Sequence, residues 1–330
     1  MTTSTTMRLA AAGIAALALT GCGVGSAMVG VHDAPAETAT TAPVAAEAAE
    51  TVAARVLADA ARARAATGEE AKELRAKALT GGALTVSSSD SRLARAGSPT
   101  PEPVTKPDAP KVLAISRGSS FPRVMLVQST RDDGAALLNL LVSEAATAPF
   151  KLAASAPMQP GTSVAALDEL DEGSPLNTDG KGLAVAPKAL LAEYAASLNY
   201  PKPAAATHVQ AKDRFAEQVR ANAKSQATSL DKLATLTQKH APQPKNTMAI
   251  ALKDGGAVVF GLIERVDTIA LKPSGKSLTP NADFQRLIGR KTLTERAEMR
   301  TFETVVFTVP KEGKASLVAV DEALVSAKGE

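Results

Sequence analysis

Residues 247–271 read TMAIALKDGGAVVFGLIERVDTIAL. Apolar and β-branched residues fill both ends of this stretch, and Asp254-Gly255-Gly256 lies between them. A short Asp/Gly segment between two apolar runs is typical of a turn that joins antiparallel strands. The stretch therefore predicts a hairpin with one strand over 247–253 and a longer strand over 257–271.

A second hairpin is predicted nearer the C-terminus. The runs 295–309 and 316–324 are apolar and β-branched, and Lys311-Glu312-Gly313 supplies a turn between them. Alternation along the first run places Val305 on one side of the pleat and Val306 on the other. Because both sides carry apolar residues, we expect the sheet to be covered on one face and curled on the other.

The first half of the chain shows the same kind of pattern. Short apolar runs predict strands over 83–87, 111–116, 123–130, 136–143 and 151–158. Asp132-Asp133-Gly134 predicts an antiparallel turn between the third and fourth of these runs. We expect the proline-rich segment 97–110 to be a surface loop, with a domain linker as the alternative, and we expect a second loop over 159–187.

Helical spacing comes before the strands in each half. Val44, Ala48, Val52, Val56 and Ala60 recur every four residues, and Thr67 with Glu70 has the spacing of a capping box. These features predict two helices, the second ended by Gly81-Gly82. Further apolar spacing predicts helices over 188–198, 209–240 and 281–287.

The order of these elements predicts an α+β fold. Helices followed by an antiparallel meander occur twice, and this order resembles that of cystatin-like or nuclear-transport-factor-2-like domains. We therefore expect two tandem domains, each with helices against a curved antiparallel sheet, over residues 44–186 and 187–330.

The N-terminus resembles a bacterial lipoprotein signal. Arg8 precedes the apolar run Leu9 to Leu19, which is too short to span a bilayer and is followed by Leu19-Thr20-Gly21-Cys22, a tetrad similar to a lipobox. The resemblance implies a signal peptide over 1–21 and a diacylglyceryl group on the Cys22 thiol, with a fatty acid such as palmitate. A buried free cysteine is the alternative for Cys22. We expect 22–43 to be a flexible tether and the protein to lie at the extracytoplasmic face of the cell membrane.

Several short runs carry a wider resemblance to a known family. They are 78–86, 121–127, 148–152, 156–161, 179–183, 194–201 and 254–261. Together they resemble an uncharacterised family of actinobacterial lipoproteins that carries a domain of unknown function. The resemblance implies an anchored extracytoplasmic protein without assigned activity or catalytic residues. The small residues around Ala153 depart from the family pattern, in which an aromatic is expected.

Composition argues against several classes of function. The 330 residues include one Cys, three His and no Trp, with 3% aromatic residues and a formal charge of +3. A single Cys forms no disulfide within the chain, and the dispersed His residues lack zinc-ligand spacing. Few aromatics and a small net charge argue against a nucleic-acid partner. We expect no cofactor and no metal, and we expect the acidic run 168–172 to be solvated rather than to bind calcium.

No catalytic motif is present, since Gly-x-Ser-x-Gly is absent and His240 is expected at the solvated end of a helix. The leading interpretation is a non-enzymatic, lipid-anchored envelope protein that acts as a binding or interaction module, with a small hydrophobic or lipid ligand as a sub-hypothesis. The alternatives are an extracytoplasmic enzyme of unrecognised type and a docking partner of another envelope protein. If the protein binds a ligand, we expect an enclosed apolar pocket. If it is an enzyme, we expect clustered carboxylates or a buried His within that pocket. If it docks to another protein, we expect an exposed apolar patch or an open edge strand.

Overall fold

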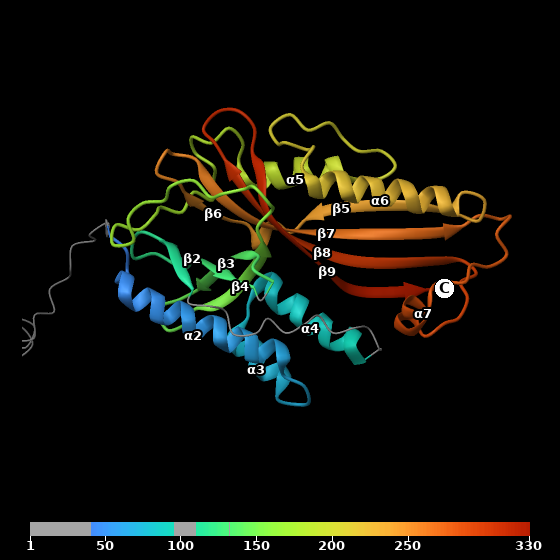
Figure 1. The fold of residues 1–330 in the computed structure, drawn as a ribbon, viewed down its shortest axis with the longest axis horizontal. Helices are drawn as coiled ribbons and strands as arrows, with labels where there is room; N and C mark the ends of the chain where they lie inside the picture. Colours follow the sequence, from blue (N-terminus) through green and yellow to red (C-terminus); the bar gives the residue numbers. More distant parts are fainter. Residues whose placement is uncertain (1–40, 96–109, 132) are drawn as a thin grey trace, which may run out of the picture. The chain divides into compact units, whose positions relative to one another are not determined.

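The computed structural model describes residues 41–95, 110–131 and 133–330 and has an α+β fold with two antiparallel sheets (Figure 1). The predicted signal peptide 1–21, Cys22 and most of the predicted tether 22–43 lie outside the described residues, as does nearly all of the segment 97–110. None of the helices described is long and apolar enough to cross a membrane.

The first sheet has four strands in the order β1-β2-β3-β4. They are β1 (Lys111–Ile115), β2 (Arg123–Thr130), β3 (Ala136–Ser143) and β4 (Lys151–Pro157). All neighbours are antiparallel, and Thr130 pairs with Ala136 around the turn at Gly134, where φ is +82°. The structure therefore confirms four of the predicted strands and the hairpin between β2 and β3.

The second sheet contains both hairpins predicted in the second half of the chain. Its strands are β5 (Ala234–Pro242), β6 (Met248–Ala251), β7 (Ala257–Leu271), β8 (Arg296–Val309) and β9 (Ser316–Gly329). The order is β5-β7-β8-β9, and β6 pairs with the beginning of β7, which β5 does not reach. Strand β7 is therefore central, because it pairs with β5 and β6 on one side and with β8 on the other.

Helices precede each sheet in the sequence. The first group is α2 (Ala46–Ala65), α3 (Ala71–Ala78) and α4 (Gly81–Arg95), and the second is α5 (Pro187–Leu198) and α6 (Arg214–Leu230). The short elements η1 (Pro244–Asn246) and α7 (Ala282–Ile288) lie between strands of the second sheet. The predicted capping box at Thr67 is not formed, because α3 begins after Glu70 and no side chain caps it.

Both faces of the second sheet are covered, so the expectation that one face would only curl is wrong. Helices α5 and α6 lie along one face in Figure 1, where the ring of Tyr194 meets Phe307 edge-on at 4.9 Å. On the other face, Phe260 and Val306 join Leu126 and Leu138 of the first sheet in one buried cluster. The two sheets therefore share a core, and this core frames the site described below.

The predicted strand over 83–87 is wrong, because these residues belong to α4. The chain does contact the first sheet, but just before residue 81: Leu79 forms a parallel bridge with Leu152, and Thr80 N–H donates to the carbonyl of Leu152. Gly81 then takes a φ of +53°, which turns the chain into the helix. The Gly81-Gly82 pair thus begins a helix instead of ending one.

The predicted helix over 209–240 is also wrong over its second half. Helix α6 ends at Leu230, and β5 follows with buried residues at alternate positions, among them Leu236, Gln238 and His240. Spacings of three and four residues among the leucines imitate a helix, whereas the pairing of β5 with β7 decides the structure. His240 is consequently buried in a sheet, and the expected solvated position at a helix end is wrong.

Candidate functional site

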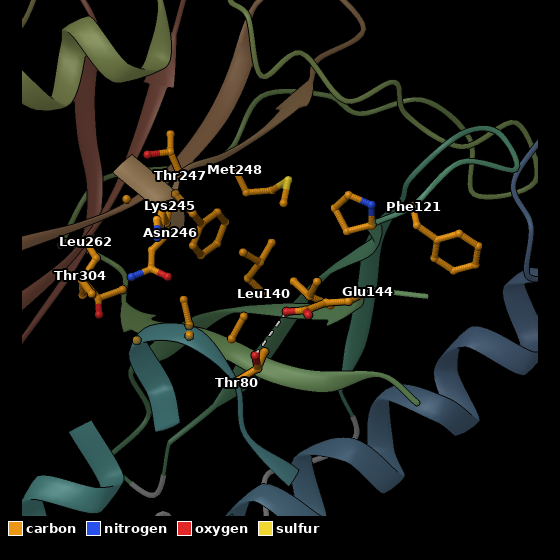
Figure 2. Close-up of a pocket in the computed structure, with 18 residues that line it drawn as sticks. Thr80, Phe121, Leu140, Glu144, Lys245, Asn246, Thr247, Met248, Leu262 and Thr304 are labelled. Carbon is orange, nitrogen blue, oxygen red and sulfur yellow. Dashed lines mark hydrogen bonds between the residues drawn. The ribbon is translucent and has the colours of Figure 1, made fainter. Parts of the chain in front are cut away.

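A cavity of about 320 Å³ lies where α4, β3 and β4 meet η1, β6 and β7 (Figure 2). This volume falls within the range of about 300–1,000 Å³ that is usual for small-molecule pockets. We call it the inter-sheet pocket. Its lining residues are Thr80, Gly81, Gly82, Phe121, Pro122, Leu140, Val142, Glu144, Ala153, Ala154, Lys245, Asn246, Thr247, Met248, Phe260, Gly261, Leu262 and Thr304.

The interior of the inter-sheet pocket is apolar. Leu140 and Val142 of β3 lie on one side, and Phe260 and Leu262 of β7 lie on the other, all of them buried. Between them, β4 contributes only small side chains around Ala153. The missing aromatic noted in the sequence therefore has a structural consequence, since the small residues leave space at this wall.

Two glycines allow α4 to approach the pocket closely. A Cβ on Gly82 would lie 3.3 Å from Leu262 Cδ1, and a Cβ on Gly81 would lie 3.4 Å from Asn246 Oδ1. Contacts near 3.3 Å require the neighbouring side chain to give way. The paired glycines therefore let the first turn of α4 line the pocket with backbone atoms.

Polar groups lie at one side of the pocket and at its opening. The hydroxyl of Thr80 donates to Glu144 Oε1 at 3.4 Å, and both Glu144 and Lys245 are exposed. Thr304 is only 8% exposed. Within the described ranges, the side chains of Lys245, Thr247 and Thr304 make no hydrogen bond or ion pair.

Several runs that carry the family resemblance meet at this pocket. The runs 78–86, 121–127 and 254–261 each contribute lining residues, although they are far apart in sequence. Sequence patterns alone do not predict the pocket, because the runs belong to segments that are predicted separately. The Gly81-Gly82 pair is the one local signal that could have pointed to a close approach of backbone to another segment.

The acidic run 168–172 lies in a loop, as expected, but it is not simply solvated. Arg117 Nη2 lies 3.2 Å from Asp168 Oδ2 and 3.9 Å from Glu172 Oε2, and Lys253 Nζ lies 3.9 Å from Glu169 Oε1. Asp168, Glu169 and Glu172 thus lie near basic side chains of the same chain, while the Glu169 and Glu172 side chains remain 80% and 66% exposed. Among the residues that the structure describes, no group of three or more His, Cys, Asp or Glu side chains could hold a metal ion.

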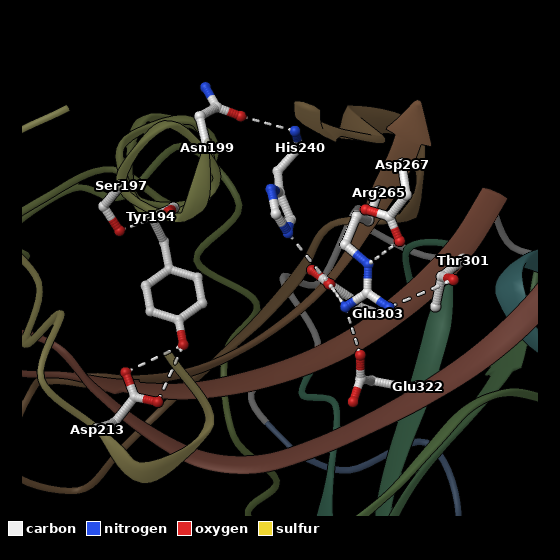
Figure 3. A network of polar contacts seen from close by, with 10 residues as sticks. All are labelled: Tyr194, Ser197, Asn199, Asp213, His240, Arg265, Asp267, Thr301, Glu303 and Glu322. Carbon is white, nitrogen blue, oxygen red and sulfur yellow. Dashed lines mark hydrogen bonds and ion pairs between the residues drawn. The ribbon is translucent and has the colours of Figure 1, made fainter. Parts of the chain in front are cut away.

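A separate buried ionic cluster lies on the opposite face of the second sheet (Figure 3). Arg265 of β7 donates to Glu303 Oε1 of β8 at 3.0 Å and to Glu322 Oε1 of β9 at 2.6 Å. His240 Nε2 of β5 lies 3.3 Å from the same Glu303 oxygen, and Arg265 Nε lies 3.3 Å from Asp267 Oδ2. The cluster therefore connects all four long strands of the sheet.

On this face, burial is the main cause of the raised pKa values of Asp267 and Tyr194. Burial raises the pKa of the Asp267 carboxyl, and the nearby Arg265 and His240 only partly oppose it. Burial and the carboxylate of Asp213 raise the pKa of the Tyr194 hydroxyl, which donates to Asp213 Oδ2 at 3.0 Å. These groups hold α5 and the strands together, and none of them lines the inter-sheet pocket.

Comparisons with known proteins place the chain in a family without assigned function. No curated protein and no solved structure matches the chain. A family model described as a domain of unknown function (DUF8094) matches residues 45–329, which include all but the first four residues and the last residue of the part the structure describes. The chain therefore belongs to the DUF8094 family.

Proposed function

We propose that this protein is a lipid-anchored binding protein of the cell envelope that takes a small hydrophobic or lipid ligand into the inter-sheet pocket. The anchor would be a diacylglyceryl group on Cys22 after removal of residues 1–21, and the tether 22–43 would keep the folded part near the membrane surface. The observation that carries the ligand proposal is the apolar interior formed by Leu140, Val142, Phe260 and Leu262.

The hydrophobic effect supports binding of an apolar ligand in this interior. Removing apolar surface from water is favourable by roughly 25 cal/mol per Å². Small side chains at Ala153 and Ala154 keep the space open between two buried walls. A ligand with an apolar body would complete the packing that the facing sheets leave unfilled.

The position of the ionic groups favours binding over catalysis. An enzyme would require reactive or titratable groups facing its substrate. His240, Asp267 and Glu303 are on the face of the second sheet that α5 and α6 cover, whereas the pocket opens on the other face. Within the pocket, Glu144 is the one carboxylate among the lining residues, and it is exposed.

Few large hydrophobic side chains are exposed among the described residues, which favours a ligand pocket over a large docking surface. Among the described residues, Leu74 and Leu233 are the exposed large hydrophobics, each 40% exposed. They lie on two different elements, one on α3 and one just after α6. The outer side of β5 is partly covered, because Tyr200 pairs with Gln238.

We further propose that the two helix-then-sheet halves are tandem domains over 44–186 and 187–330, each a cystatin-like or nuclear-transport-factor-2-like unit. The element order supports this proposal, because α2 to α4 precede β1 to β4 and α5 to α6 precede β5 to β9. On this interpretation the ligand would bind between the two domains. Separate expression of each half, followed by circular dichroism and thermal unfolding, tests whether each folds independently.

The binding proposal can be tested with tryptophan fluorescence, because the chain contains no Trp. Phe121→Trp places a reporter at the pocket, and Phe284→Trp on α7 provides a matched reporter away from it. Decanol is titrated into the full chain in phosphatidylcholine vesicles. We expect a saturable change at position 121 only, and we expect Ala154→Phe to abolish it while Ala241→Phe on the exposed side of β5 does not. Equal, unsaturable changes in both reporters would refute the proposal.

A further inference from the structure

Three groups at the inter-sheet pocket are hydrogen-bond donors without a protein partner among the described residues. Leu84 N–H bonds to the carbonyl of Thr80, so the N–H groups of Gly81 and Gly82 precede the first intrahelical bond of α4. Both glycines line the pocket, and Lys245 adds an ammonium at its opening. These three groups can donate but cannot accept.

An independent observation points to the same part of the pocket. Thr304 lines it, is 8% exposed and has no side-chain partner among the described residues. Thr304 lies opposite Leu262 in the register of β7 and β8, and Leu262 is the side chain that a Cβ on Gly82 would approach. Thr304, a largely buried residue whose side chain has no partner among the described residues, therefore lies near the donor groups at the start of α4, and Figure 2 shows it beside Leu262 and Asn246.

The charges near these donors favour a negative group. The start of an α-helix carries the equivalent of roughly half a positive charge, and Lys245 adds a full one. Among the lining residues Glu144 is the opposing charge, and it already accepts a hydrogen bond from Thr80 and is exposed to solvent. The Asp321 carboxyl group is opposite Thr304 in the register of β8 and β9 but does not line the pocket. The two backbone N–H groups and the Lys245 ammonium can each bind a hydrogen-bond acceptor, and their positive potential favours an acceptor that is negatively charged.

We infer that the ligand of the inter-sheet pocket is an amphiphile with an acidic head group, such as a carboxylate, which binds the start of α4, Thr304 and Lys245 while its tail lies against Phe260 and Leu262. This inference rests on the proposed function and names the ligand class for the same pocket.

The test compares three ligands with the same tail. Decanoate, decanol and decylamine are titrated into the full Phe121→Trp chain in phosphatidylcholine vesicles. We expect decanoate to bind about tenfold more tightly than decanol and decylamine to bind most weakly. Acetate, which has the head group alone, should not displace decanoate, because the tail supplies much of the affinity.

Two variants separate the charge effects. Lys245→Met keeps an apolar stem and should weaken decanoate binding about tenfold without changing decanol binding, whereas Glu144→Gln should strengthen decanoate binding. Lys202→Met removes an exposed ammonium that does not line the pocket and should change neither.

The outcomes distinguish this inference from the proposed function. If decanol binds as tightly as decanoate and Lys245→Met changes neither, the acidic head group is refuted while the apolar pocket stands. If decylamine binds best, the inference is also refuted and Glu144 is the recognising group. If none of the three ligands binds, the proposed function itself fails.

Discussion

His240 Nε2 lies 3.3 Å from Glu303 Oε1, and neither side chain is exposed to solvent. The two residues belong to β5 and β8, which are not neighbours, because β7 runs between them. Arg265 of β7 donates to the same Glu303 oxygen. The buried carboxylate of Glu303 therefore lies beside side chains of both β5 and β7 and accepts a hydrogen bond from the one on β7.

Removing the Glu303 carboxylate should destabilise the protein strongly. Glu303→Ala leaves Arg265 with fewer partners in a buried environment, and breaking a buried ion pair in this way costs roughly 3–5 kcal/mol. Urea unfolding monitored by circular dichroism measures the loss. Glu322→Ala is the matched control, because that side chain is 41% exposed and should cost less than about 1 kcal/mol. Equal losses in the two variants would contradict the role given to Glu303.

The approach of α5 to β7 requires a glycine. A Cβ on Gly261 would overlap the side chain of Leu191, which is fully buried and cannot move aside. Gly261→Ala should therefore destabilise the fold by roughly 1–3 kcal/mol through overpacking. The double variant with Leu191→Ala should lose less than the sum of the two single variants, because the new methyl group then has room. Strictly additive losses in thermal unfolding would argue against this contact.

Asp321 should make stability depend on pH. Burial raises the pKa of its carboxyl from 3.8 to about 6, with Arg64 and Arg131 acting in the opposite direction. The folded state thus favours the protonated form. This contribution to stability is full below pH 3.8 and is lost as the pH rises through about 6.

Asp321→Asn should remove this pH dependence. The variant should be more stable than the wild type at pH 7, by on the order of 2 kcal/mol, and the two should converge near pH 4. Unfolding in urea across this pH range gives both curves. A constant difference between the variant and the wild type at every pH would show that the Asp321 carboxyl does not titrate as described.

Lipidation at Cys22 can be tested directly. Cys22→Ser removes the thiol that a diacylglyceryl group would modify, so we expect loss of fatty-acid labelling and an uncleaved precursor. Metabolic labelling with an alkyne fatty acid and the mass of the intact chain provide the measurements. Labelling that persists in Cys22→Ser would refute the anchor.

Local patterns predicted most strands but failed where a distant segment decides the structure. The hairpin at Asp254-Gly255-Gly256 was predictable, because turn residues and apolar alternation agree within one stretch. The helix that starts at Gly81 was not, since a Gly-Gly pair usually ends a helix. There the backbone N–H of the preceding residue, Thr80, donates a hydrogen bond to the carbonyl of Leu152, and no local sequence pattern predicts this contact. The switch from α6 to β5 was missed for the same reason, because pairing with β7 overrides the helical spacing of the leucines.

The inter-sheet pocket could not be predicted from single segments. Its walls come from β3, β4 and β7, and its opening comes from Lys245 and the start of α4. Each lining residue alone is an ordinary apolar, small or exposed polar residue. The pocket results from the packing of two sheets, and sequence patterns predict the sheets separately but not their contact.

Photo-cross-linking tests the central claim, that the inter-sheet pocket binds an amphiphile, most directly. The full chain in phosphatidylcholine vesicles is irradiated with a decanoic acid that carries a diazirine at its tail, and the adducts are mapped by peptide mass spectrometry. We predict adducts on Phe260, Leu262 and neighbouring residues of the pocket, and we predict that Ala154→Phe abolishes them while Ala241→Phe does not. Adducts scattered over the surface, or pocket adducts that persist in Ala154→Phe, would contradict the account.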